Sequence, residues 1–225
     1  MDEGGRYDLA DRQRCSSAGR YLGTGTSDVR RNAGKSLEET AMMQDLAMQI
    51  LEILMNSIQA GARHILVKIR ESRKDNVIEI TVQDDGKGMS PELAARVSDP
   101  FTTTRKTRKV GMGVAFLKGM TEQCNGAFDI QSEVGKGTII TASVQRDCID
   151  TPEMGDLGEM MMDCISADDS IDYVLRFSTD EKEFVFESGE VRKQLAGVPL
   201  QTPEVLLWMK EYISEEIKQI KEENE

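Results

Sequence analysis

Two side chains spaced four residues apart, Glu52 and Asn56, stand out in the segment EILMNSIQAGA as candidates for phosphate chemistry. On a helix this spacing puts both on one face, beside the apolar stripe of the same helix. A carboxylate can act as a general base, and a carboxamide oxygen can ligate a hard cation such as Mg²⁺. Taken alone, the pair fits a polar strip that faces solvent better than it fits a catalytic site.

A second candidate is the turn DDGKGM at residues 84–89, which directly follows the alternating run VIEITVQ. The alternation puts Asp84 on the buried side of the strand, where a carboxylate needs hydrogen-bond donors. The amino group of adenine and a bound water could supply them. Gly86 and Gly88 permit a positive φ and a close approach of the backbone. A plain two-glycine turn is the alternative interpretation.

A third candidate is the helix start GMGVAF, in which Gly111 and Gly113 precede apolar residues. Backbone amides at a glycine-rich helix start make a phosphate site. The dinucleotide fingerprint is excluded because Phe116 takes the place of its third glycine. The preceding loop carries a local cluster of basic side chains, suited either to a triphosphate or to an ordinary basic surface, at Arg105, Lys106, Arg108 and Lys109.

Periodicity predicts the elements that must position these residues. Strands are expected at 64–72, 76–83, 127–133, 138–145, 173–178 and 183–188. Helices are expected at 37–61, 91–97, 114–124, from 151 and from 203, with Ser90 capping the second and Gly126 able to end the third.

The predicted fold class is α+β, a two-layer sandwich. Its mixed sheet, from residues 64–83 and 127–145, is covered on one side by the helices at 40–60 and 114–124. Residues 1–37 read as a disordered tail or as sequence upstream of the true start. Residues 38–148 form the main domain and residues 149–225 an acidic α/β extension. Whether the hairpin of the extension continues the sheet or forms a separate layer stays open.

The charge distribution limits the classes of partner. The 225 residues carry a net charge of −12. Residues 150–225 hold 7 Lys and Arg against 20 Asp and Glu, which leaves the rest near neutral. We therefore expect no nucleic-acid partner.

No apolar run is long enough to span a membrane, and the N-terminus has no secretory signal. Four cysteines without CxxC spacing favour a reducing cytoplasm.

The order of these segments carries more information than any one of them. EILMNSIQAGARHI resembles an asparagine box, DDGKGM a first glycine box, DPF a phenylalanine box, and GMGVAFLKGM a second glycine box. SEVGKGTIITASV resembles the closing strand segment of the same pattern. Together, over residues 44–146, they resemble the GHKL ATPase superfamily of gyrase, heat-shock chaperone, histidine kinase and mismatch-repair domains. The resemblance implies the Bergerat type of ATP-binding sandwich.

The resemblance implies a role for each matching residue. Asn56 would ligate Mg²⁺ at the ATP phosphates, Glu52 would be the catalytic acid or base, and Asp84 would bind the adenine amino group. Asp85 would face solvent or support the turn. Further contacts to the nucleotide are implied for Gly86, Gly88, Met89, Phe101, Lys109, Gly111, Gly113, Val114 and Thr138.

Three features of the sequence bear on the branch of the superfamily. Gln59 stands where the mismatch-repair branch has an aspartate, and the short lid is closer to the kinase branch. The only histidine, His64, starts a strand, and we expect it to be structural and not a phosphoacceptor. The resemblance therefore implies a stand-alone, histidine kinase-like, cytosolic ATP-binding protein, with a regulatory or signalling role. It would hydrolyse ATP or phosphorylate a protein partner, or else act as a non-catalytic, nucleotide-dependent switch. A homodimer is compatible with either.

Overall fold

The structure is a computed structural model, and it describes residues 45–97 and 112–223. All of them lie in one compact unit, Thr40–Glu225. The predicted tail at 1–37 and the loop with the basic cluster lie outside the described residues.

The described unit is built on a six-stranded sheet with the order β3-β4-β2-β1-β5-β6. All neighbouring strands are antiparallel except β1 and β5, which run parallel, so the sheet is mixed as predicted. The strands are β1 (His64–Ser72), β2 (Val77–Asp84), β3 (Ala127–Glu133), β4 (Gly137–Gln145), β5 (Asp172–Ser178) and β6 (Glu183–Glu187).

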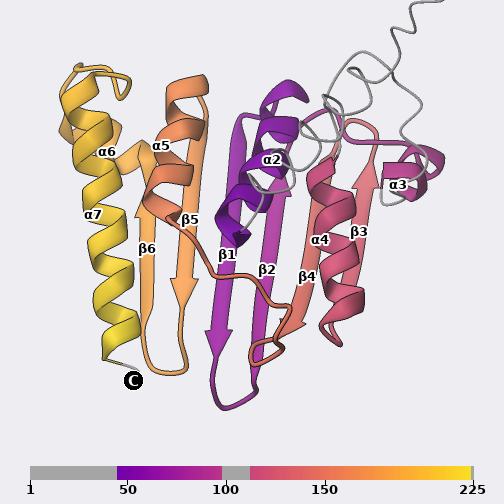
Figure 1. Cartoon of the computed structure of the whole chain (residues 1–225). Helices are drawn as coiled ribbons and strands as arrows, with labels where there is room; N and C mark the ends of the chain where they lie inside the picture. The colour runs from indigo at the N-terminus through magenta and orange to yellow at the C-terminus, as the bar shows by residue number, and fades with distance from the viewer. Residues whose placement is uncertain (1–44, 98–111, 224–225) are drawn as a thin grey trace, which may run out of the picture. The chain divides into compact units, whose positions relative to one another are not determined.

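Helices cover one face of this sheet (Figure 1). They are α2 (Leu46–Gln59), α3 (Pro91–Val97), α4 (Met112–Gln123), α5 (Leu157–Ala167), α6 (Ser188–Gln194) and α7 (Pro203–Glu222). The alternation in β2 explains the two faces, because Ile80 and Val82 are buried while Glu79 and Gln83 are exposed. The α+β two-layer sandwich is therefore confirmed.

The helix predicted to start at residue 37 begins instead at Leu46. Asp45 has an extended backbone, and its carboxylate accepts a hydrogen bond from the Met48 amide at 2.8 Å, which makes it the N-cap. Leu46 and Ala47 donate their amides to the carbonyls of the segment before α5. The sequence contains no glycine or proline at this point, so a capping aspartate was the only local signal.

Two other helix ends differ from the prediction. Asn125, with a φ of 50°, follows α4 in the left-handed conformation expected of Gly126. The helix predicted from residue 151 begins at Leu157, because Asp156 caps it through the amides of Gly158 and Glu159. By contrast, Ser90 caps α3 as predicted, through the Leu93 amide.

The hairpin of the C-terminal extension continues the main sheet. Strand β5 pairs with β1 over seven residues, from His64 opposite Asp172 to Arg70 opposite Ser178. The aromatic and aliphatic side chains predicted to share a face do so and are buried, namely Tyr173, Leu175, Phe177, Phe184 and Phe186. Helix α6 was not predicted. The boundary at residue 148 stays an interpretation of composition, since one sheet runs across it.

Candidate functional site

Asp84 ends the central strand β2, opposite Thr138 of β4 and Ile65 of β1. The residue is only 9% exposed. Ser57 Oγ donates a hydrogen bond to Asp84 Oδ2 at 2.7 Å, and the Gly86 amide donates to Oδ1 at 2.9 Å. Each carboxylate oxygen has two acceptor positions, so each keeps one for a further donor. The carboxylate is thus fixed in orientation and still able to bind a ligand N–H or a water.

The glycine turn after Asp84 packs too closely for side chains. A Cβ atom on Gly88, whose φ is +62°, would lie 2.0 Å from the Glu133 carbonyl oxygen. A Cβ on Gly86 would lie 2.9 Å from that of Ala60, which caps the end of α2. The Lys87 amide donates to the Ala60 carbonyl at 3.0 Å. The turn is therefore wedged between the end of α2 and the β3–β4 turn.

Asp85 supports this turn from its exposed side. Its Oδ1 accepts hydrogen bonds from the amides of Arg63 and His64 at 2.7 and 2.9 Å. Partial burial raises the pKa of the Asp85 carboxyl, but the two backbone hydrogen bonds and the nearby His64 outweigh it, and the pKa is lowered. The geometry agrees with both roles expected for Asp85, since it is exposed and holds the start of β1.

A hydroxyl network lies on the other side of Asp84. Ser132 Oγ accepts a hydrogen bond from the Met89 amide at 2.8 Å and donates to the Gly137 carbonyl at 3.0 Å. It also lies 2.9 Å from Oγ1 of Thr138, which is 9% exposed. The network joins two predicted site residues, Met89 and Thr138.

Ser57 and Ser132 were missed by sequence reasoning. Ser57 lies four residues after Ile53 on the core face of α2, where a buried hydroxyl needs a partner. Ser132 is the direct cross-strand neighbour of Thr138. Both signals depend on contacts between elements, which only the assembled fold shows.

Glu52 lies beside the start of α4. A Cβ atom on Gly113 would lie 2.7 Å from Glu52 Cβ and 3.2 Å from the Gln49 carbonyl oxygen, so the glycine lets the two helices approach. Glu52 and Asn56 are both partly exposed. Among the residues that the structure describes, neither side chain makes a hydrogen bond or an ion pair. As far as the described residues are concerned, their polar atoms are available to a ligand.

The first turn of α4 supplies backbone amides without intrahelical acceptors, including those of Gly113 and Val114. Val114 is 3% exposed and its side chain belongs to the core, so a nucleotide could reach only its backbone. The predicted contacts of Phe101, Lys109 and Gly111 lie outside the described residues.

The side chains at this site could hold Mg²⁺ only if the ATP phosphates supplied further ligands to the ion. No cluster of three or more His, Cys, Asp or Glu side chains able to hold a metal occurs within residues 45–97 and 112–223. The Asn56 carboxamide offers one hard oxygen ligand. This is compatible with Mg²⁺, which takes few protein ligands when phosphates and water supply the rest.

A hollow of about 660 Å³ lies at the other end of the central strands. Its walls are largely ionic and include none of the predicted site residues. Glu71, at the end of β1, accepts from Arg146 Nε at 3.0 Å and pairs with Lys221 Nζ at 3.3 Å. These contacts tie the end of α7 to β1.

The mixed sheet, the helices on one face and the buried carboxylate at the end of β2 define the class of α+β sandwich expected from the sequence. A family profile described as "Histidine kinase-, DNA gyrase B-, and HSP90-like ATPase" matches residues 43–147, from the start of α2 to the end of β4. This part of the chain therefore matches that ATPase family, and the resemblance to the superfamily that the sequence predicted is confirmed.

Similar proteins cover the same part of the chain. The sensor histidine kinase ZraS of Salmonella typhi is 35% identical over 116 residues, which are 50% of this chain and 24% of ZraS. The uncharacterized sensor-like histidine kinase R01002 of Rhizobium meliloti is 26% identical over 140 residues, 56% of this chain and 26% of that protein. The chain thus spans about a quarter of the length of these curated relatives.

Solved structures show weaker likeness. The Aquifex aeolicus MutL ATPase domain complexed with ADP has a TM-score of 0.41 and 14% identity, over 68% of each chain. The N-terminal domain of a DNA repair protein has a TM-score of 0.43 and 17% identity, over 70% of this chain and 55% of that one.

Of the helices described here, none is both long and apolar enough to cross a membrane.

Proposed function

We propose that the chain binds Mg-ATP between α2, the glycine turn and the start of α4, and uses it in ATP hydrolysis or in phosphoryl transfer to a protein partner. The observation that carries the proposal is the Asp84 carboxylate, fixed by Ser57 and Gly86 with acceptor positions left over. The match of residues 43–147 to an ATPase family supports the choice of nucleotide.

Each side chain has a defined part in this proposal. The Asp84 carboxylate accepts a hydrogen bond from the adenine amino group. Thr138, held by Ser132, positions a water that contacts adenine. The first-turn amides of α4 donate to phosphate oxygens, where the helix dipole favours negative charge. Asn56 would ligate Mg²⁺, which neutralises charge on the phosphates when bound.

Glu52 is the proposed general base. The close packing of Gly113 against Glu52 Cβ supports this role, because it brings the Glu52 backbone near the first turn of α4, where the phosphates would lie. A solvent-facing strip would not require this contact. A carboxylate placed there can accept a proton from a water or from a partner hydroxyl as the phosphate is attacked.

The test is Glu52→Ala in the full chain. ATP affinity, measured by titration calorimetry, should change less than about threefold, because the base contributes mainly to the transition state. Phosphate release, and transfer to candidate partner proteins, should fall at least about 100-fold. Glu122→Ala, at the far end of α4, is the matched control and should keep both. If the Glu52→Ala variant keeps the wild-type turnover, Glu52 is not the general base.

The alternative is a non-catalytic switch in which ATP changes the surface offered to a partner. It is favoured if the protein binds ATP through Asp84 but shows no Glu52-dependent turnover with any partner tested. The only histidine starts strand β1, and this position supports a structural role over phosphoacceptance. The protein partner, the homodimer, the signalling role and the cytosolic location stay predictions.

A further inference from the structure

Strand β6 is an edge of the sheet with an unused side. It pairs with β5 through five residue pairs, from Val174 opposite Glu187 to Ser178 opposite Glu183. Within the described part of the chain, no backbone hydrogen bond reaches its outer edge. Such an edge presents N–H and C=O groups that an extended segment can pair with.

An aromatic shelf, Trp208 and Tyr212 of α7, stands over this edge. The two rings stack at 5.5 Å with an interplanar angle of 6°, and the Tyr212 ring meets Phe184 of β6 edge-on at 5.7 Å. Trp208 is 49% exposed and Tyr212 is 38% exposed. Exposed aromatic pairs of this kind are typical of protein interfaces.

The shelf faces outward from the sheet. Gly158 of α5 packs against the Lys210 carbonyl and Ser214, so these two positions of α7 face α5. Met209 and Ile213 are fully buried toward the sheet. At 100° per residue, Trp208 and Tyr212 then lie on the flank away from α5. Because α7 is the outermost helix beside β6, this flank borders the space beyond the strand (Figure 1).

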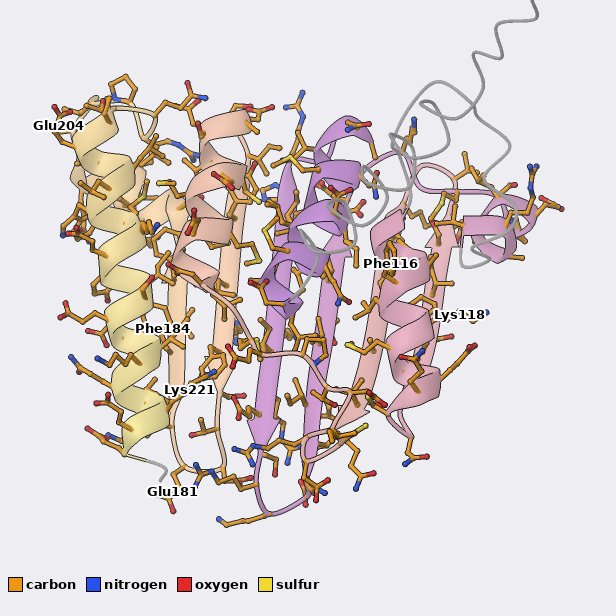
Figure 2. The ribbon with its side chains drawn as sticks, viewed as in Figure 1. Phe116, Lys118, Glu181, Phe184, Glu204 and Lys221 are labelled. Atoms are coloured by element: carbon orange, nitrogen blue, oxygen red, sulfur yellow. The ribbon has the colours of Figure 1, made fainter. Side chains whose placement is uncertain are left out.

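The surroundings of the shelf are mainly acidic, with Lys182 and with Arg176, which lies opposite Val185, as basic neighbours. Glu204 lies in the first turn of α7 and Glu181 lies in the turn before β6, at the two ends of this surface (Figure 2). Glu183 and Glu187 point away from the helices on β6, since Phe184 and Phe186 between them are buried. Across the described ranges, no ion pair is made by Glu181, Glu183, Glu204, Glu211 or Glu215.

We infer that β6 and the aromatic shelf form a docking site for an extended, basic and apolar segment of a partner protein, which adds a strand to the sheet. Its side chains would alternate, apolar ones beneath Trp208 and Tyr212, and Lys or Arg ones toward Glu183 and Glu187. The inference concerns the opposite edge of the sheet from α4 and holds whether or not Glu52 is a base.

A second copy of the chain is a poor occupant. Two β6 strands side by side would set Glu183 and Glu187 against the same carboxylates of the other copy, and like charges directly opposite destabilise a pair. A short, charged edge could also serve only to block pairing with other chains. The exposed aromatic shelf is what distinguishes docking from simple protection, and it provides the test.

The experiment uses the full chain, whose only tryptophan is Trp208. The probe is a synthetic peptide that alternates lysine and valine and is long enough to pair with all of β6. Saturable blue-shift of the Trp208 emission is expected, with an affinity that falls as salt is added. A glutamate and valine peptide should not bind, and the lysine peptide N-methylated along one edge should bind at least about tenfold more weakly.

Variants locate the binding. Tyr212→Ser should weaken the lysine peptide about tenfold while Trp208 still reports. Tyr212→Phe should restore most of the affinity. Leu207→Ser, which removes a 53% exposed side chain from the other flank of α7, should have no effect. Unchanged ATP affinity in all three would show that the variants fold.

Four results would overturn the inference. They are no saturable binding of the lysine peptide, equal binding of both peptides, equal losses in Leu207→Ser and Tyr212→Ser, and a Trp208 emission in the free protein that is already that of a buried indole. Sedimentation provides a fifth: a dimer that Trp208→Ser dissociates would assign the surface to a second copy.

Discussion

Ser57 Oγ donates a 2.7 Å hydrogen bond to Asp84 Oδ2, and this bond joins helix α2 to the end of the central strand. Both residues are buried, at 3% and 9% exposure. Asn56, the residue before Ser57, is thereby held at a fixed place relative to the carboxylate. Asp84, the predicted ligand of adenine, and Asn56, the predicted ligand of Mg²⁺, are therefore coupled through Ser57, which the sequence analysis did not identify.

Ser57→Ala should therefore weaken ATP binding without abolishing it. The carboxylate keeps the Gly86 amide as a donor but loses its second anchor, so we expect about a fivefold loss of affinity by titration calorimetry. The free energy of unfolding should fall by about 1–3 kcal/mol in urea titrations, because a buried acceptor loses its donor. Gln59→Ala, at an exposed position on the same helix, is the control and should change neither quantity.

Asp84→Ala should cost more. Loss of a charge-assisted hydrogen bond to adenine predicts ATP binding weaker by about 1.5–3 kcal/mol, roughly ten- to a hundredfold or more. Guanine carries no amino group at the same ring position, so discrimination between ATP and GTP should also narrow. Asp85→Asn next to it should leave the affinity within about twofold, since among the described residues the Asp85 carboxylate accepts hydrogen bonds only from backbone amides. Equal calorimetric titrations of wild type and Asp84→Ala would refute the adenine assignment.

Much of the fold could be predicted because periodicity is local. The strand β1 was predicted with both bounds correct, since Ile65, Val67 and Ile69 alternate with outward-facing residues. The pairing of β5 with β1 could not be predicted, because it depends on contacts over about a hundred residues of chain. The starts of α2 and α5 were misplaced for a different reason. Aspartates at 45 and 156 cap them, and apolar residues continue the helical pattern on both sides of each cap.

The sequence predicted which motifs contribute to the site, but not how their residues are arranged in space. The order of the boxes identified Asp84, Gly88 and Gly113. The structure puts Asp84 against Ser57, in the last turn of α2, and Gly113 against Glu52, at the middle of the same helix. Their physical reasons emerged only with the fold: Gly88 is needed because the Glu133 carbonyl occupies the place of a side chain. Val114 matched its motif, yet its side chain packs in the core, which a motif cannot distinguish from a ligand contact.

Asp85 should make the stability depend on pH at the acid end. Burial raises the pKa of its carboxyl, but the hydrogen bonds from His64 and Arg63 outweigh it and lower the pKa below the ordinary value. The folded state thus favours the ionised form. The stability from this site is complete above the ordinary aspartate range and is lost as the pH falls through the lowered pKa.

Asp85→Asn should reduce this dependence. Urea unfolding followed from neutral pH downward should show a shallower acid decline for the variant than for the wild type. Asp129→Asn is the control and should keep the wild-type slope, because among the described residues the Asp129 carboxylate accepts a hydrogen bond only from the Gln131 side chain. A variant with the same slope as the wild type would mean that other carboxylates account for the acid loss.

Gly113→Ala and Gly119→Ala should have opposite effects, although both lie in α4. At Gly119 an added methyl group meets nothing within 4 Å, and alanine has the higher helix propensity. The free energy of unfolding should rise there by about 0.5–1 kcal/mol. At Gly113 the same methyl group would lie 2.7 Å from Glu52 Cβ and must push α4 away from α2, which should cost about 1–3 kcal/mol. Because that shift also moves the first-turn amides, ATP affinity should fall at least about tenfold in Gly113→Ala and stay unchanged in Gly119→Ala. If Gly113→Ala lowers stability but leaves ATP affinity intact, the start of α4 does not bind the phosphates, and the glycine serves packing alone.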